Sequence, residues 1–222
     1  MHGGVAAVLL AAALLAAPVV IPAGNPGAVA PATAACPGAE VVFARGRLEA
    51  PGPGAVGNAF ISALRSKVWG RNISSYPVNY PADTQIDQGA NDISRHVQHT
   101  INRCPGTRVV LGGYSLGAAA TDMVLAVPTR IAGFSNPLPP GTDRHIAAVA
   151  LFGNGTQWVG PITMFNPIYN DRTIDLCHGA DPICNPAEPQ TWQRDWPQHQ
   201  AGGYIASGMV NQAADFVAGK LR

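Results

Sequence analysis

Residues 107–127 constrain the fold more than any other part of the chain, because they join a strand pattern, a tight turn and a helix pattern. The stretch TRVVLGG is apolar without alternation, which is typical of a strand buried on both faces of a parallel sheet. Small residues around Ser115 then lead into a helical run that stops at Pro128. Since neighbouring parallel strands are joined by helical crossovers, the segment predicts a layered α/β domain.

The alternation of strand and helix patterns continues along the chain. We expect further strands at 40–44, 76–81, 145–153 and 172–177, and further helices at 58–69, 85–102 and 204–221. In the second of these helices apolar residues recur every three or four positions, the spacing of one helix face. The prediction is a single domain with a central, mostly parallel five-stranded sheet and helices on both faces.

The first 34 residues have the pattern of a secretory signal peptide. Val5–Ala17 is apolar but too short to span a bilayer well, and Ala32–Ala34 offers the small residues of a cleavage site. The segment before Val5 has no Lys or Arg, which suggests a start codon further upstream. We therefore expect a signal peptide at 1–34 and one domain at 35–222; the alternative is a membrane anchor or lipid-facing tail.

Composition limits the partners of the chain. Its 14 basic and 13 acidic residues form no charge run, which argues against nucleic acid or a strongly anionic membrane surface. No later segment approaches the ~18–20 apolar residues of a membrane-spanning helix, so we expect no stable membrane insertion. The prediction is a secreted monomer, extracellular or associated with the cell wall.

Four cysteines remain after the expected cleavage, and an even number in an exported chain predicts two disulfides. Three pairings are open. Cys177 and Cys184 enclose a short loop, which favours their pairing and leaves Cys36 for Cys104. A zinc site is the alternative, but no C-x-x-C pair supports it.

The residues at the turn, Gly113-Tyr114-Ser115-Leu116-Gly117, form a G-x-S-x-G motif between a strand and a helix. This arrangement exposes a serine hydroxyl and directs the next backbone N–H at a developing oxyanion. The alternative is a glycine-padded turn with Ser115 as helix N-cap. In its strand–turn–helix context we interpret Ser115 as a nucleophile and the domain as an α/β-hydrolase.

Such a hydrolase needs an acid and then a histidine further along the chain. Asp181 follows the last expected strand inside the Cys177–Cys184 ring, whereas Asp122 lies in the helix after Ser115 and Asp175 within a strand. His199 lies in an expected loop before the final helix. For four other histidines we expect surface roles, a solvated helix face for the first two: His96, His99, His145 and His178.

These motifs together resemble the cutinase family, in particular the cutinase-like secreted esterases of mycobacteria and related actinobacteria. The resemblance rests on G-Y-S-x-G, on CHGADPIC at 177–184, on His199 and on FARG at 43–46. It implies Ser115 as nucleophile, His199 as base, Asp181 as its orienting acid and the disulfides Cys36–Cys104 and Cys177–Cys184. It also implies an oxyanion hole from the backbone N–H groups of Leu116 and Arg47.

Arg47 departs from fungal cutinases, which carry a serine there. Because one lost oxyanion donor costs about 2.7–4 kcal/mol, we expect a slower esterase than those enzymes. The 134–143 loop and the stretch between Asp181 and His199 are proline-rich and short. We therefore expect no lid domain and an open site, in which Leu138 and Ile183 either line an acyl groove or only pack their loops.

The expected activity is hydrolysis of short- to medium-chain fatty acyl esters, small-molecule or lipid, without metal or cofactor. The acyl group would pass through an ester with Ser115 before water releases it. Two alternatives remain open: a weakly active or inactive secreted protein that binds lipid or a surface partner, and an acyltransferase or thioesterase.

Overall fold

The computed structural model describes residues 1, 35–158, 160–185 and 188–222. One sheet contains five strands in the order β2-β1-β3-β4-β5, and every neighbouring pair is parallel. The strands are β1 (Ala39–Ala44), β2 (Ile73–Pro77), β3 (Arg108–Tyr114), β4 (Ile146–Phe152) and β5 (Thr173–Leu176). The expected single-domain α/β-hydrolase fold with a parallel five-stranded sheet is confirmed.

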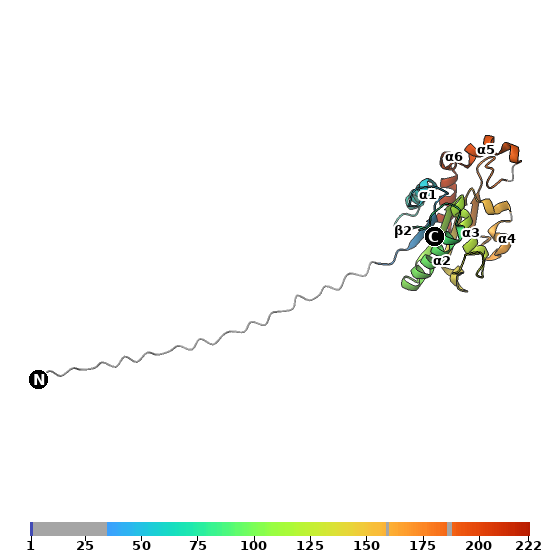
Figure 1. Cartoon of the computed structure of the whole chain (residues 1–222). Coiled ribbons are helices and arrows are strands. Elements are labelled where there is room, and N and C mark those ends of the chain that lie inside the picture. The colour runs from blue at the N-terminus through green and yellow to red at the C-terminus, as the bar shows by residue number, and fades with distance from the viewer. Residues whose placement is uncertain (2–34, 159, 186–187) are drawn as a thin grey trace. The chain divides into compact units, whose positions relative to one another are not determined.

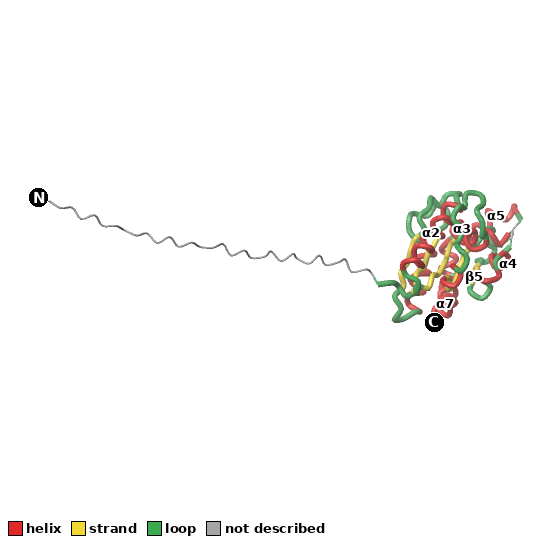
Figure 2. Tube along the Cα trace, turned by 90° about the horizontal axis from the view of Figure 1, so that it is seen from below, coloured by secondary structure: helices red, strands yellow, loops and turns green. Residues whose placement is uncertain are grey.

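Helices cover both faces of this sheet, as the ribbon and tube views show (Figure 1, Figure 2). One face packs against α1 (Gly54–Lys67), α6 (Ala201–Ala206) and α7 (Met209–Leu221). The other face packs against α2 (Ile86–Arg103), α3 (Leu116–Ala126) and α4 (Ile162–Phe165). The remaining helices are α5 (Trp192–His199) and four short 3₁₀ turns: η1 (Thr142–His145), η2 (Gly155–Trp158), η3 (Pro167–Tyr169) and η4 (Pro189–Thr191).

The two hydrophobic cores follow from the alternation of side chains along each strand. In β1, Val41 and Phe43 enter the core under α1 and α7, whereas Val42 enters the core under α2 and α3. Both faces of β4 are covered, and all seven of its residues are buried. This is why the central strands read as unbroken apolar runs.

Three expected boundaries were wrong for local reasons. The second strand is 73–77 rather than 76–81, because prolines at 77 and 81 cannot donate to a ladder and an edge strand tolerates the polar sequence ISSYP. The first helix starts at Gly54, directly after Pro53, inside the expected loop. The last helix is divided, because Gly208 adopts φ 83° between α6 and α7.

Parallel strands place different features at the two edges of the sheet. The strand starts lie at one edge, together with the Cys36–Cys104 disulfide and a hydrogen bond from Arg108 Nη2 to the carbonyl of Lys220. The carboxyl ends of β3 and β5 lead to Ser115 and Asp181 at the other edge. Open parallel sheets bind ligands at this second edge.

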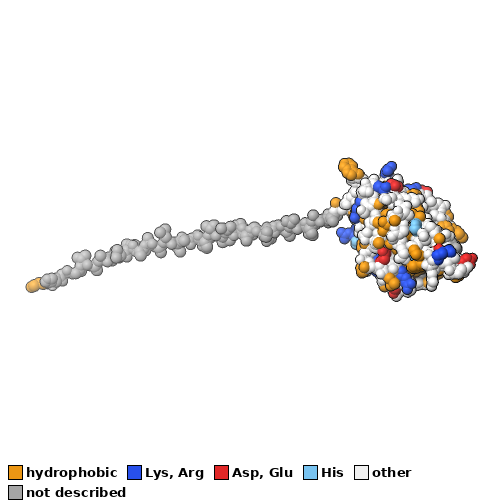
Figure 3. All heavy atoms as spheres, turned by 90° about the horizontal axis from the view of Figure 1, so that it is seen from above, with side chains coloured by type: hydrophobic (Ala, Val, Ile, Leu, Met, Phe, Trp, Pro, Cys, Tyr) orange, Lys and Arg blue, Asp and Glu red, His pale blue; other side chains and the backbone are white. Residues whose placement is uncertain are grey.

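The surface carries few charges, since Lys, Arg, Asp and Glu make up only 12% of the chain. Figure 3 shows apolar side chains spread between isolated charged groups on the face in view. Within the described residues, no helix is both apolar and long enough to span a bilayer. The expected signal peptide at 1–34 lies outside the described residues, apart from Met1.

Candidate active site

The turn after β3 holds Ser115 in a conformation that few non-glycine residues adopt. Its φ is 54° and its ψ −119°, and its N–H donates to the carbonyl of Phe152 at 2.8 Å. Both flanking glycines are required by close backbone approaches. A Cβ on Gly113 would lie 2.3 Å from the carbonyl oxygen of Gly117, and one on Gly117 would lie 2.1 Å from that of Ala44. The turn is thus built around a strained serine.

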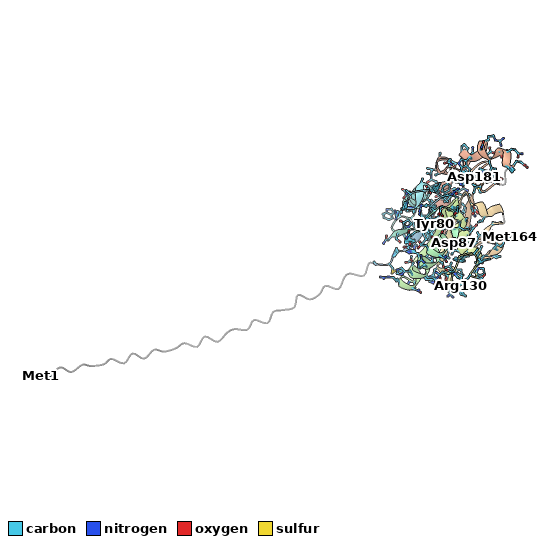
Figure 4. All side chains as sticks on the ribbon, in the orientation of Figure 1. Met1, Tyr80, Asp87, Arg130, Met164 and Asp181 are labelled. Carbon is cyan, nitrogen blue, oxygen red and sulfur yellow. A yellow bond between two sulfur atoms is a disulfide. The ribbon has the colours of Figure 1, made fainter. Side chains whose placement is uncertain are left out.

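The structure brings Ser115, His199 and Asp181 into one hydrogen-bonded series. Ser115 Oγ lies 2.8 Å from His199 Nε2, and His199 Nδ1 lies 2.7 Å from Asp181 Oδ2. His199 is the last residue of α5, so the expectation of a loop at this position was wrong. Figure 4 shows Asp181 at the end of the domain where α5 and α6 lie, with Arg130 at the opposite end.

Asp181 is fully buried and has three hydrogen-bond donors. They are His199, the hydroxyl of Tyr204 at 2.5 Å and the backbone N–H of Ile183 at 2.8 Å. Burial raises the pKa of this carboxyl, but the three hydrogen bonds outweigh burial, so its pKa lies below the ordinary value. The Cys177–Cys184 disulfide closes the loop that carries Asp181. An ionised, immobilised carboxylate beside His199 results.

Two tyrosines that the sequence reasoning did not assign support the histidine and the acid. The Tyr114 hydroxyl donates to the backbone carbonyl of His199, and the two rings stack with centroids 5.4 Å apart. The Tyr204 hydroxyl, besides donating to Asp181, accepts the N–H of His178 at 3.2 Å. Burial is the main cause that raises the pKa of both tyrosines, so each stays a hydroxyl donor. Because Tyr114 lies within the G-x-S-x-G motif, its position in the sequence could have indicated a role beside Ser115.

The loop that carries Arg47 is held by two charged residues that sequence reasoning also missed. Arg45 is buried, and its guanidinium donates to the carbonyls of Glu49, Val78 and Tyr80. The Glu49 carboxylate accepts the N–H groups of Gly46 at 2.6 Å and Ala55 at 2.8 Å. The available signal was an arginine and a glutamate in a stretch that otherwise contains mostly Gly, Pro and Ala.

A groove of about 500 Å³ opens over Ser115. Backbone or side-chain atoms of both expected oxyanion donors, Leu116 and Arg47, line it, as does Ile183 but not Leu138. Leu138 packs instead against the core under α2 and α3. The complete lining is Arg47, Leu48, Glu49, Tyr114, Ser115, Leu116, Ala119, Gly155, Ile183, Trp196, His199, Gln200 and Ala201.

Among the residues that the structure describes, no lid domain covers this groove, but the stretch between Asp181 and His199 is more helical than expected. Its described residues include η4 and α5. From α5, Trp196 extends over the site, with its ring centroid 5.1 Å from that of His199 and 43% of its surface exposed. The half-exposed side chain of Trp196 therefore forms one wall of the groove.

Two histidines expected at the surface are half-buried and have partners from other elements. His96 Nε2 lies 3.1 Å from Glu40 Oε2, and the His96 ring stacks on Tyr76 at 3.4 Å. His178 Nδ1 lies 3.0 Å from the carbonyl of Gln198. The error has one cause: sequence spacing does not reveal partners contributed by another strand or helix. Among the described residues, no three His, Cys, Asp or Glu side chains gather as a metal site would require.

Asp122, set aside as the acid, is buried away from His199. Its Oδ2 accepts hydrogen bonds from Asn154 Nδ2 at 2.7 Å and from the Thr156 hydroxyl. The same Asn154 Nδ2 lies 3.0 Å from Asp175 Oδ2. Burial raises the pKa of Asp122 to about 6, and the nearby Asp175 adds to the rise. Asp122 and Asp175 thus form a separate carboxylate pair that shares the side-chain amide of Asn154.

Comparisons with known proteins show the family to which the chain belongs. A family model described as cutinase matches residues 35–221. The chain is 72% identical over 219 residues to "Probable carboxylesterase Culp2" of Mycobacterium tuberculosis, across 99% of this chain and 95% of that protein. It is 46% identical over 221 residues to "Phospholipase Culp4" of the same species, across 98% and 90%.

A solved structure of Trichoderma reesei cutinase in complex with a C11Y4 phosphonate inhibitor is similar in fold. Its TM-score is 0.63 at 26% identity, over 84% of this chain and 78% of that one. The family match covers nearly the whole described domain, and the two relatives match at 72% and 46% identity over most of their own lengths. The chain belongs to the cutinase family and is a carboxylic ester hydrolase.

Proposed function

We propose that residues 35–222 form a secreted serine esterase that hydrolyses short- to medium-chain fatty acyl esters. Residues 1–34 serve as its signal peptide in this proposal. Two disulfides support an oxidising destination outside the cytoplasm. The apolar residues of the groove, Leu48, Leu116, Ile183 and Trp196, suit an acyl chain.

The observation that carries the proposal is the unbroken series from Ser115 Oγ through His199 to Asp181, at 2.8 Å and 2.7 Å. Attack by Ser115 Oγ on the ester carbonyl carbon transfers the hydroxyl proton to His199 Nε2. Asp181, ionised at neutral pH because of its lowered pKa, then faces the imidazolium that forms. Ionisation of Asp181 therefore favours the transition state more than the ground state.

The tetrahedral intermediate carries its negative charge on the former carbonyl oxygen. In the proposal, the backbone N–H groups of Leu116 and Arg47 stabilise this oxyanion. Leu116 starts α3, whose N-terminal partial positive charge acts in the same direction. The hydrogen bonds of Arg45 and Glu49 hold the Arg47 loop before substrate arrives, so little reorganisation is needed during reaction.

Collapse of the intermediate breaks the bond to the alcohol oxygen, which takes the proton from His199. The acyl group remains as an ester on Ser115. Water then attacks this ester and gives a proton to His199 Nε2. The bond between the acyl carbon and Ser115 Oγ breaks, Oγ takes that proton back from His199, and the carboxylic acid is released. Atoms and charge balance in both halves without a metal or redox cofactor.

The test compares Ser115→Ala with wild type on p-nitrophenyl butyrate. We expect a loss of kcat of about 10⁶-fold, the size seen when an activated serine is removed from a triad. Ser62→Ala is the matched control, since Ser62 lies exposed on α1. A fluorophosphonate probe should label wild type at Ser115 and leave Ser115→Ala unlabelled. Unlabelled wild-type protein would favour the alternative of a lipid- or surface-binding protein, and retained turnover in Ser115→Ala would refute the mechanism.

A further inference from the structure

The helix that begins after Ser115 has an unusual distribution of polarity. Its two polar residues, Thr121 and Asp122, are buried at 1% and 3% exposure. Its half-exposed positions form an apolar stripe at helical spacing: Ala119, Met123, Ala126 and the adjoining Val127. By contrast α2, on the same face of the sheet, exposes polar residues such as Arg95 and His99. A surface helix normally exposes polar residues, as α2 does. The apolar outer face of α3 is instead typical of a helix that something covers.

The apolar stripe forms the floor of a second hollow, which we call the α3 groove. It has a volume of about 260 Å³, and its walls include Ile86 from the start of α2 and Ile162 and Phe165 from α4. Among the described residues that line it, Asp122 is the only ionisable one. Figure 4 places Met164, also on α4, on this side of the domain. The α3 groove therefore offers apolar surface with almost no polar competition.

The α3 groove adjoins the groove over Ser115. Ala119 lines both hollows, and Gly155 of the first is followed in the chain by Thr156 of the second. A helix rises about 1.5 Å per residue, so Ala126 lies roughly 16 Å along α3 from Ser115. An extended acyl chain advances about 1.25 Å per methylene, given C–C bonds of about 1.52 Å. A chain of about twelve carbons therefore extends about 14 Å from an ester on Ser115, to within one helical turn of Ala126.

We propose that the α3 groove binds the distal part of the acyl chain of the ester undergoing hydrolysis. The inference rests on the proposed function and extends it, because it assigns chains of about ten or more carbons to this enzyme. A hollow of about 260 Å³ suits one extended alkyl chain, and its ten described lining residues are far fewer than the roughly 20–30 that a stable protein interface buries on each side. Its position beside the groove over Ser115, with Ala119 lining both, favours the acyl chain of the ester over a free lipid as the occupant.

Two variants test the groove by different means. Phe165→Glu places a charge at the wall, where the wild-type side chain is 52% exposed and contributes little to the core. Ala126→Trp fills the far end. The matched control is Ile168→Glu, an apolar residue of η3 that is 44% exposed and does not line the groove. Each protein is assayed on p-nitrophenyl dodecanoate and p-nitrophenyl butyrate, both below their aggregation concentrations.

We expect both groove variants to lower kcat/KM for the dodecanoate roughly 15-fold or more, as expected for two or more methylenes returned to water. For the butyrate the same variants should stay within about twofold of wild type, because four carbons end near Ala119. Ile168→Glu should leave the ratio of the two rate constants unchanged. An unchanged ratio in both groove variants, or an equal change in Ile168→Glu, would overturn the proposal.

A binding measurement separates this proposal from the proposed function. In a Ser115→Ala background, methyl dodecanoate binding is followed by intrinsic tryptophan fluorescence, with and without Phe165→Glu. Weaker binding with Phe165→Glu supports the groove even if wild type lacks esterase activity. Size-exclusion chromatography provides a further check: a wild-type dimer that Phe165→Glu converts to a monomer would show a protein interface and overturn the acyl-chain assignment.

Discussion

Two carboxylates, Asp181 and Asp122, are both almost completely buried, yet their pKa values move in opposite directions. Burial raises both. At Asp181 it is outweighed by donors from His199, Tyr204 and the backbone, so the pKa is lowered. At Asp122 the hydrogen bonds from Thr156 and Asn154 do not compensate for burial, and Asp175 adds a like charge. The pKa of Asp122 therefore rises to about 6.

The contrast shows that burial alone does not identify a functional acid. What distinguishes Asp181 is the number of donors aimed at it, one of them the imidazole that gains charge during reaction. At Asp122, Oδ1 is buried without a hydrogen-bond partner among the described residues. Asp181 is therefore built to stay charged, and Asp122 is built to hold a proton in mildly acidic solution.

Replacing each of these two aspartates with asparagine should give the largest difference in kcat. Asp181→Asn should lower kcat on p-nitrophenyl butyrate by about 10⁴-fold, because an amide cannot stabilise the imidazolium or hold its tautomer. Asp122→Asn should leave kcat within a few-fold of wild type. Equal losses in the two variants would show that Asp181 acts only as a structural residue.

Asp122→Asn should instead change stability, with a dependence on pH. The folded pKa of about 6 exceeds the ordinary 3.8, so the folded state binds more protons and wild type loses stability as pH rises through this window. Above pH 6 the free energy of unfolding of Asp122→Asn should exceed that of wild type by at most about 3 kcal/mol. Near pH 3.5 the two proteins should differ little. Urea unfolding at both pH values measures this. A pH-independent difference would contradict the raised pKa.

The two disulfides should separate stability from activity. Cys177→Ser with Cys184→Ser removes a short ring and should cost about 2.5 kcal/mol of unfolding free energy. It should also lower kcat, because the Asp181 loop loses its closure. Cys36→Ser with Cys104→Ser opens a loop with a sequence separation of 68. That pair should cost more stability, about 4 kcal/mol, with kcat unchanged while the protein is folded. An unchanged kcat without Cys177–Cys184, together with a lowered kcat without Cys36–Cys104, would refute a role for the short ring in holding Asp181.

Tyr204→Phe removes one of the donors to Asp181 and should have the smallest effect. We expect kcat/KM to fall by about 10- to 150-fold, the value of one hydrogen bond to a charged group. The pKa of Asp181 should rise, which would move the acidic limb of the pH–rate profile upwards. Tyr169→Phe, at a buried tyrosine of the other core, serves as control. An unshifted acidic limb would mean that the Tyr204 hydroxyl does not contribute to charging Asp181.

Local patterns in the sequence were sufficient to predict the sheet, and together with the resemblance to cutinases they predicted that Ser115, Asp181 and His199 act together. Each of the three adjoins a feature with a local signature: a glycine turn, a cysteine ring and the start of a helical run. Their catalytic roles stay predictions until the variants are measured. The boundaries of β2 and α1 were wrong because proline both ends a strand and begins a helix, and the sequence does not show which neighbour lies beside it.

The supporting residues could not be predicted because their partners come from distant segments. Arg45 reaches carbonyls more than thirty residues away, and Tyr204 reaches Asp181 across 23 positions. The pairing of His96 with Glu40 spans 56 positions. Such contacts depend on the order of strands in the sheet, which no single segment encodes.

The edge of the sheet where the strands begin also holds both ends of the domain. Gly38 accepts a hydrogen bond from the Arg108 N–H, and the Arg108 side chain reaches the carbonyl of Lys220. Ser115 lies past the opposite ends of the strands. A carrier protein, bead or solid support joined at either end of residues 35–222 would therefore attach on the side away from the groove. The domain is suited to immobilisation with its substrate entrance facing the solution.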